Sequence, residues 1–304
     1  MSLMWRAAAG LGTAVATLMA ALLVVLVGQP VSAQWIGRTQ VATLQQGPLE
    51  RHYRVYRPAG LEAKPGLVID LHGAHTGGFL EEVATRFDAQ ADRYGWIVAY
   101  PEGVADGWEP YGCCHHAGVD DVAFIAGLID RLEASDRVDP DRVYVTGLSR
   151  GGMMAHRLAC QLSTRLAAIG PVAGNMADEN GRAGSVDCRP ERPISVLAIH
   201  GSADSEVPIV GGGRFAPLSD VVARWRQLDA CASEGSRHVA GPSTTLGWRC
   251  RSGTEVRSVV VQGAGHTWPG TPLSSLPWAP AASLDASSTI ADFFADHRRA
   301  PETR

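Results

Sequence analysis

Residues 143–154, VYVTGLSRGGMM, place a serine between two glycines at the end of an apolar segment. Gly147 and Gly151 lie two residues to either side of Ser149, whereas a simple helix N-cap would need only the serine. Both glycines are needed if the backbone bends so sharply that nearby side chains would collide. Because the stretch follows an apolar strand pattern and precedes a helical one, it predicts a nucleophile elbow with Ser149 as the nucleophile.

An elbow predicts an acid and a histidine later in the chain, each on a loop that follows a strand. The segment SVLAIHGSADSEVP supplies Asp204, and SVVVQGAGHTWPG supplies His266. In this arrangement Asp204 orients the imidazole, and His266 takes the serine proton and later protonates the leaving group. The alternatives are that Asp204 only forms a turn, with Asp220 as the substitute acid, or that His266 is a loop residue without a role.

Acyl transfer also requires backbone donors for a developing oxyanion. One donor is expected to be the N–H of Arg150, which follows the nucleophile at a helix N-terminus. The other is expected in LHGAHTGG, from Ala74 or, failing that, His75, with Gly73 allowing a close backbone approach. A glycine turn between strand and helix would explain the same residues without a donor.

Short apolar runs alternate with helical patterns along the chain. GLVIDLHG, GWIVAYPEG, RVYVTGLS, AAIGPVAG, ISVLAIHG and VRSVVVQGAGH are almost continuously hydrophobic, which is typical of parallel strands buried on both faces. Helical patterns fit residues 122–132, with Asp120 or Asp121 as the cap, and residues 151–162, 218–228 and 288–297. The alternation predicts a single α/β domain with a doubly wound, mostly parallel sheet and helices on both faces, whose site lies on loops at the carboxyl ends of the strands.

The composition is that of a globular protein without a basic surface. The chain has 304 residues, of which 45% are hydrophobic and 19% charged, and its net charge is −4. These values leave no electrostatic basis for a nucleic-acid partner.

The N-terminus differs from this average. Arg6 is followed by an apolar run over residues 7–27 and by small residues up to Ala33. This order predicts a secretory signal peptide over residues 1–33, followed by a mature domain over residues 34–304. The alternative is an uncleaved membrane anchor. With cleavage, we expect a secreted, extracellular or periplasmic protein that has no stable membrane insertion.

Several motifs in chain order, LHGAHTGG, YPEGVADGW, GCCHHAGVDDVAF, GLSRGGMMAHRLAC, PVAG, HGSADSEVP and GAGHTWPG, resemble the secreted polyhydroxybutyrate depolymerase and feruloyl esterase-type proteins, which are similar to carbohydrate esterase family 1. The resemblance covers about residues 50–295. It implies an α/β-hydrolase fold and serine esterase chemistry without a cofactor, and it places nucleophile, acid and base on Ser149, Asp204 and His266. Arg150 departs from the family pattern, in which a small or amide residue commonly follows the serine.

The 6 cysteines of a chain with a secretory leader suggest disulfides. We expect Cys160–Cys188 at the end of the sheet where the strands begin, and Cys231–Cys250 on either side of a local excursion of the chain. Cys113 and Cys114 are adjacent in sequence and form either a disulfide or two thiols. The CCHH run lacks the usual zinc spacings, so no metal site is predicted.

Trp108, Tyr111 and Trp268 lie on loops at the predicted catalytic end and, with His75, are candidate substrate-binding residues; ordinary packing is the alternative for the aromatic rings. The substrate is expected to be a soluble or hydrated ester with a short acyl chain, a hydroxyalkanoate oligomer, or feruloyl or acetyl groups on polysaccharide. The alternatives are an acyltransferase on the same scaffold and a catalytically inactive hydrolase fold that serves as a binding protein.

Overall fold

A computed structural model describes residues 38–105, 107–110, 118–177, 188–271 and 284–299. The predicted leader, Tyr111 and the Cys113–Cys114 pair lie outside the described residues. The chain divides into two units, Met1–Thr39 and Gln40–Arg304, and the site and its core lie in the second.

The described part of the chain contains one 10-stranded sheet with the order β1-β2-β4-β3-β5-β6-β7-β10-β9-β8. Its strands are β1 (Thr39–Gln46), β2 (Leu49–Tyr56), β3 (Leu67–Leu71), β4 (Ile97–Pro101), β5 (Val143–Leu148), β6 (Ala168–Val172), β7 (Ser195–Gly201), β8 (Ser236–Ala240), β9 (Ser243–Arg249) and β10 (Glu255–Val261).

The six strands predicted from apolar runs form the parallel centre of this sheet, β4-β3-β5-β6-β7-β10. Antiparallel strands extend it at both edges, where β2 pairs with β4 on one side and β9 and β8 follow β10 on the other. The edge strands were not predicted because they carry no continuous apolar run, and every residue of β8 is exposed. The predicted α/β architecture is confirmed.

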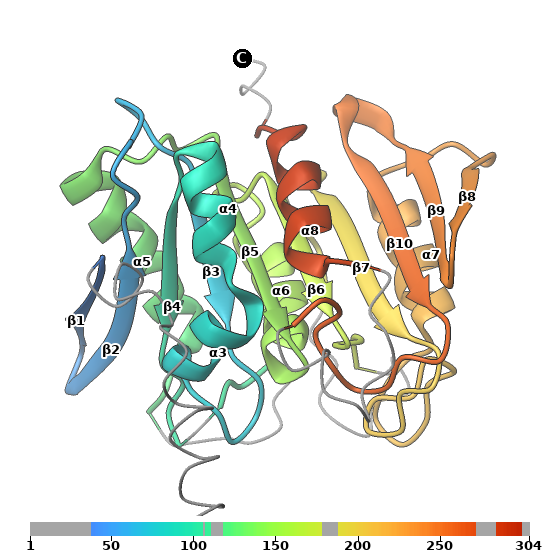
Figure 1. Cartoon of the computed structure of the whole chain (residues 1–304), viewed down its shortest axis with the longest axis horizontal. Coiled ribbons are helices and arrows are strands. Elements are labelled where there is room, and N and C mark those ends of the chain that lie inside the picture. Colours follow the sequence, from blue (N-terminus) through green and yellow to red (C-terminus); the bar gives the residue numbers. More distant parts are fainter. Residues whose placement is uncertain (1–37, 106, 111–117, 178–187, 272–283, 300–304) are drawn as a thin grey trace, which may run out of the picture. The chain divides into compact units, whose positions relative to one another are not determined.

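The helices are α3 (Gly78–Thr85), α4 (Phe87–Tyr94), α5 (Asp121–Asp136), α6 (Arg150–Gln161), α7 (Leu218–Leu228) and α8 (Ala286–Ala295), with a short 3-10 helix η1 at Arg251–Gly253. Helices α4 and α8 cover the face of the sheet turned toward the viewer in Figure 1, while α5, α6 and α7 cover the opposite face.

Side chains alternate between two cores along each central strand. In β3, Leu67 and Ile69 pack into the core shared with α5, α6 and α7, whereas Val68 packs into the core shared with α4 and α8. In β5, Val145 packs into the core shared with α5, α6 and α7, and Tyr144 packs into the core shared with α4 and α8. Burial on both faces explains why these strands are almost continuously hydrophobic.

The helix boundaries follow local capping. Asp120 caps α5, because its side chain accepts a hydrogen bond from the N–H of Ala123 at 3.0 Å. Asp285 caps α8 by accepting from Ser288 N, so this helix begins two residues before the predicted start.

Helix α3 was not predicted because its amphipathic pattern is inverted. It buries the carboxylates Glu81 and Glu82 and exposes Phe79, Leu80 and Val83. A reading that places apolar residues inside cannot find such a helix.

Candidate active site

The predicted elbow has the expected geometry. Strand β5 ends at Leu148, α6 begins at Arg150, and Ser149 between them has φ 55° and ψ −115°. This conformation is sparsely populated for any residue with a side chain. The N–H of Ser149 donates to Val172 O at 2.8 Å, and its side chain makes no capping hydrogen bond to α6. The geometry therefore disfavours the alternative in which the hydroxyl only caps the helix.

Steric crowding explains both glycines of the motif. A Cβ atom at Gly147 or at Gly151 would overlap the carbonyl oxygen of Leu71, at the end of β3. Gly174, after β6, fills a third tight position that the sequence analysis missed, because a Cβ there would lie 2.5 Å from Ser149 O. Its only sequence signal was a glycine following an apolar run. These contacts fix the elbow between β3 and β6.

The predicted acid and base meet. Nδ1 of His266 lies 2.8 Å from Oδ2 of Asp204, whose side chain is fully buried. Oδ1 of Asp204 accepts backbone N–H groups from Glu206 at 3.0 Å and Val207 at 2.9 Å. Asp204 thus forms the turn that was its alternative role while its second oxygen binds the imidazole. Asp220, the substitute acid, is exposed in the first turn of α7.

A second histidine supports the acid and was missed by the sequence analysis. The buried His200, four residues before Asp204, donates from Nε2 to Val207 O at 2.8 Å and lies 3.3 Å from Asp204 Oδ2. Burial lowers the pKa of His200, so the ring stays neutral and acts as a donor. The sequence signal was the histidine within the IHGSAD segment.

Ser149 lies at the same edge of the sheet as this pair, since β5, β6, β7 and β10 are parallel neighbours. Ser149 and His266 both belong to the described part of the chain, and no hydrogen bond joins their side chains there. Nε2 of His266, the ring nitrogen not engaged by Asp204, lies 3.8 Å from Oε2 of Glu206. Catalytic hydrogen bonds are often long in enzymes without bound substrate.

The predicted oxyanion loop follows β3. Gly73 lies beside the nucleophile, since a Cβ on it would be 3.7 Å from Ser149 Cβ, an ordinary contact that does not require glycine. Ala74 is partly buried, and His75 is exposed with φ 59°. Arg150, whose N–H is the other expected donor, is the first residue of α6. The donor roles of Ala74 and Arg150 remain predictions.

The buried His72 fastens this loop to the next one. Its Nδ1 donates to Gly73 O at 2.7 Å, and its Nε2 accepts from Gly103 N at 2.9 Å. Its carbonyl accepts from Trp108 Nε1 at 3.0 Å. Hydrogen bonds of His72 therefore join the loops after β3 and β4, a connection that no sequence motif indicated.

Two buried carboxyl groups lie beneath the elbow and the oxyanion loop. Burial raises the pKa of Asp70 to about 7, although the hydroxyl of Thr85 donates to it at 2.7 Å. Burial and the neighbouring Asp70 raise the pKa of Glu81 well above its usual range, against hydrogen bonds from the N–H groups of Leu148 and Gly73. Glu81 thus lies close to both the residue before the nucleophile and the residue before the expected oxyanion donor.

Burial favours the packing alternative for both tryptophans that the structure describes. Trp108 is 1% exposed and Trp268 is 2% exposed, and each indole N–H is satisfied internally, by His72 O and by Ser287 Oγ. Large rings on loops became part of the two cores because the loops fold back over the sheet.

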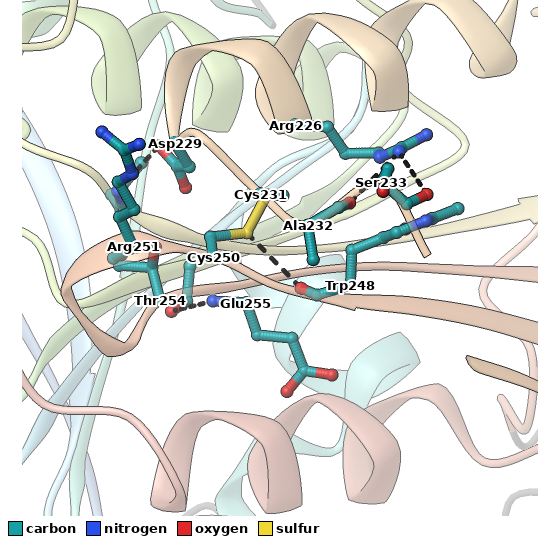
Figure 2. The surroundings of a disulfide bond; sticks show 12 residues. Arg226, Asp229, Cys231, Ala232, Ser233, Trp248, Cys250, Arg251, Thr254 and Glu255 are labelled. Atoms are coloured by element: carbon teal, nitrogen blue, oxygen red, sulfur yellow. Dashed lines mark hydrogen bonds between the residues drawn. A yellow bond between two sulfur atoms is a disulfide. The ribbon is translucent and has the colours of Figure 1, made fainter. Parts of the chain in front are cut away.

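The structure joins Cys160 to Cys188 and Cys231 to Cys250, the two pairs predicted within the described residues. The second pair links the end of α7 to the end of β9, and Figure 2 shows Arg226 lying over Trp248 beside it. The excursion between these cysteines is the β8–β9 hairpin. Within the described ranges, no cluster of three metal-ligating side chains occurs, and the CCHH run lies outside them.

Residues 51–208 match the model of the family described as esterase PHB depolymerase. The chain belongs to this family. The resemblance drawn from the sequence motifs is confirmed, and the chain is a carboxylic ester hydrolase.

Individual relatives carry related names. NocK of Nocardia uniformis subsp. tsuyamanensis, whose name assigns it to the esterases, is 34% identical over 80% of this chain and 78% of its own. Feruloyl esterase B of Piromyces equi is 30% identical over 57% of this chain, and a bifunctional acetylxylan esterase/xylanase of Neocallimastix patriciarum is 24% identical over 71%. This chain spans only 34% and 31% of the lengths of those two relatives.

Solved structures agree on the fold. An acetyl xylan esterase from Aspergillus awamori superposes with a TM-score of 0.62 at 17% identity, over 84% of this chain and 99% of that one. A thermostable esterase gives a TM-score of 0.61 over 88% of this chain and 64% of that one. The fold is that of the α/β-hydrolases. None of the helices in the described ranges has the length and apolar character needed to cross a membrane.

Proposed function

We propose that this protein is a secreted serine esterase that cleaves carboxylic esters through an acyl-enzyme on Ser149. The observation that carries the proposal is the buried Asp204 holding His266 at 2.8 Å, at the same sheet edge as a serine in a strained elbow. Because Asp204 engages Nδ1, the other nitrogen, Nε2, is the one that serves as base.

The proposed reaction has two balanced halves. Ser149 Oγ attacks the ester carbonyl carbon, its proton passes to His266 Nε2, and the carbon–oxygen bond to the alcohol breaks as the alcohol takes that proton. Water then repeats the sequence in place of the alcohol, which releases the acid and restores the serine. The N–H groups of Arg150 and Ala74 stabilise the oxyanion in both halves.

The substrate class follows from the names of the relatives and from the site. We infer acetyl or feruloyl esters, short acyl esters or hydroxyalkanoate oligomers, because feruloyl and acetylxylan esterases are among the similar proteins. Ester-bearing polysaccharide or oligomeric polyester is the corresponding partner.

Secretion is part of the proposal. The apolar leader over residues 1–33 is the reason to expect export, with residues 34–304 as the mature esterase domain. The two disulfides, Cys160–Cys188 and Cys231–Cys250, fit an oxidising compartment.

The test uses purified protein comprising residues 34–304 with p-nitrophenyl acetate, methyl ferulate, acetylated xylan and a hydroxybutyrate oligomer. We expect ester turnover and covalent labelling by a fluorophosphonate, both lost in Ser149→Ala, while the exposed Ser219→Ala retains both. Labelling without turnover of any ester in water, but with transfer to an added alcohol, would favour the acyltransferase. Absence of both labelling and turnover in the wild type would favour a binding protein.

A further inference from the structure

The proposed mechanism uses the backbone N–H of Arg150 but gives no role to its side chain. Arg150 is the first residue of α6 and is partly buried. Within the ranges that the structure describes, no carboxylate or carbonyl oxygen pairs with its guanidinium group. A cation at a helix N-terminus also opposes the helix dipole. Among the described residues, which do not include Asp106, this cation therefore has no oxygen partner, and it lies at an unfavourable place directly beside the nucleophile.

The side chain of Arg150 lies against the loop after β4. A Cβ atom at Gly107 would overlap Nη1 of Arg150 and would lie 3.2 Å from its Cδ. The guanidinium therefore lies directly against the backbone at residue 107. The same loop is fastened to the oxyanion loop, because Gly103 N and Trp108 Nε1 both donate to His72.

The strand order decides which part of an ester faces Arg150. The loops after β3 and β4 lie on one side of β5, and those after β7 and β10 lie on the other. His266, which follows β10, must protonate the leaving alcohol, so the alcohol lies on that side. With the alcohol on the His266 side and the carbonyl oxygen at the N–H groups of Ala74 and Arg150, the acyl part is the third group on the carbonyl carbon, and the inference places it against the side chain of Arg150.

We propose that Arg150 binds a carboxylate carried by the acyl part of the substrate, so that the enzyme prefers half-esters of dicarboxylic acids such as succinyl or glutaryl esters. A guanidinium presents paired donors that match a carboxylate, and the helix N-terminus adds to the attraction for the anion. This inference rests on the proposed esterase function and adds a carboxylate-bearing acyl group to the neutral acyl groups named there.

The test compares two esters with the same leaving group and acyl length, p-nitrophenyl hydrogen glutarate and p-nitrophenyl valerate. The measured quantity is the ratio of their kcat/KM values in each variant, which cancels any general loss of catalytic power. We expect Arg150→Gln to lower the ratio of charged to neutral ester by about 10-fold or more, the usual effect of losing a hydrogen bond to a charged group. Arg150→Lys should retain part of the preference because it keeps the charge without the paired donors.

Arg226→Gln is the matched control, since Arg226 lies over Trp248 on α7, away from the elbow, and should leave the ratio unchanged. Added salt should reduce the ratio in the wild type more than in Arg150→Gln. An unchanged ratio in Arg150→Gln would overturn the assignment of Arg150 while leaving the esterase function intact. Failure of the wild type to hydrolyse either ester would overturn the esterase function itself.

Discussion

The two sides of Ser149 are built in different ways. On the β7–β10 side, side chains form the site: Asp204 binds His266 with one oxygen and two backbone N–H groups with the other, and His200 braces the turn. On the β3–β4 side, the expected contributions are backbone N–H groups, and the buried His72 joins the loops after β3 and β4 through hydrogen bonds.

This difference matches the chemistry expected of each side. Proton transfer needs particular titratable side chains, whereas an oxyanion needs only N–H groups, which every residue but proline carries. The first requirement leaves a readable mark on the sequence, and the second leaves little beyond glycines. Residue substitutions should therefore affect the two sides unequally.

The largest effect is expected from His266→Ala, which removes the base. Hydrolysis should fall about a million-fold in kcat, because nucleophile and base act as a unit. Steady-state assays with p-nitrophenyl acetate measure the loss, and His238→Ala, an exposed histidine of β8, serves as the control. Substantial residual activity would show that another group is the base.

Asp204→Asn should reduce kcat about 10,000-fold, since an amide no longer holds the imidazole in the required tautomer. Asp220→Asn, which alters an exposed carboxylate on α7, should retain full activity. The reverse result would transfer the acid role to Asp220.

Gly151→Ala tests the contact that joins the elbow to the β3 side. Its Cβ would overlap Leu71 O, so the free energy of unfolding should fall by about 3 kcal/mol or more, the upper range for overpacking. Urea denaturation monitored by circular dichroism gives the value. Gly60→Ala has nothing within 4 Å of the new Cβ and should change stability little. Equal stability of the two variants would contradict the tight elbow.

The smallest expected effect is a change in the pH dependence of stability. His156 on α6 accepts a hydrogen bond from Trp225 Nε1 at 3.0 Å, and burial lowers its pKa from 6.5 to about 3. Below pH 6.5 the unfolded chain binds a proton that the folded chain refuses, so this group contributes stability above that pH and loses it as the pH falls toward 3.

The measurement is the difference in unfolding free energy between the wild type and His156→Gln at pH 7.5 and pH 4.5. We expect the difference to shrink at the lower pH, because glutamine does not titrate. Comparing variants removes the opposite contribution of Asp70, whose raised pKa costs stability as the pH rises toward 7. A constant difference would show that His156 is accessible to protons in the folded chain.

The sequence by itself determined the parallel centre of the sheet and the residues expected to carry out proton transfer. Six apolar runs became six parallel strands because burial on both faces favours an almost continuous run of hydrophobic residues. Ser149, Asp204 and His266 could be selected because few residue types can serve as nucleophile, acid and base, and because these residues follow strands in a fixed order. Close packing similarly made the glycines of the elbow recognisable.

Only the tertiary structure decided which groups support these residues and which loop side chains are buried. Trp108 and Trp268 occur on loops, and only the path of those loops places them in the two cores. The support of Asp204 by His200, of the oxyanion loop by His72, and of Arg150 by Gly107 arises between segments that local patterns do not connect. Local sequence patterns report burial and turn chemistry, but a contact between distant residues depends on how all the strands are ordered in the sheet.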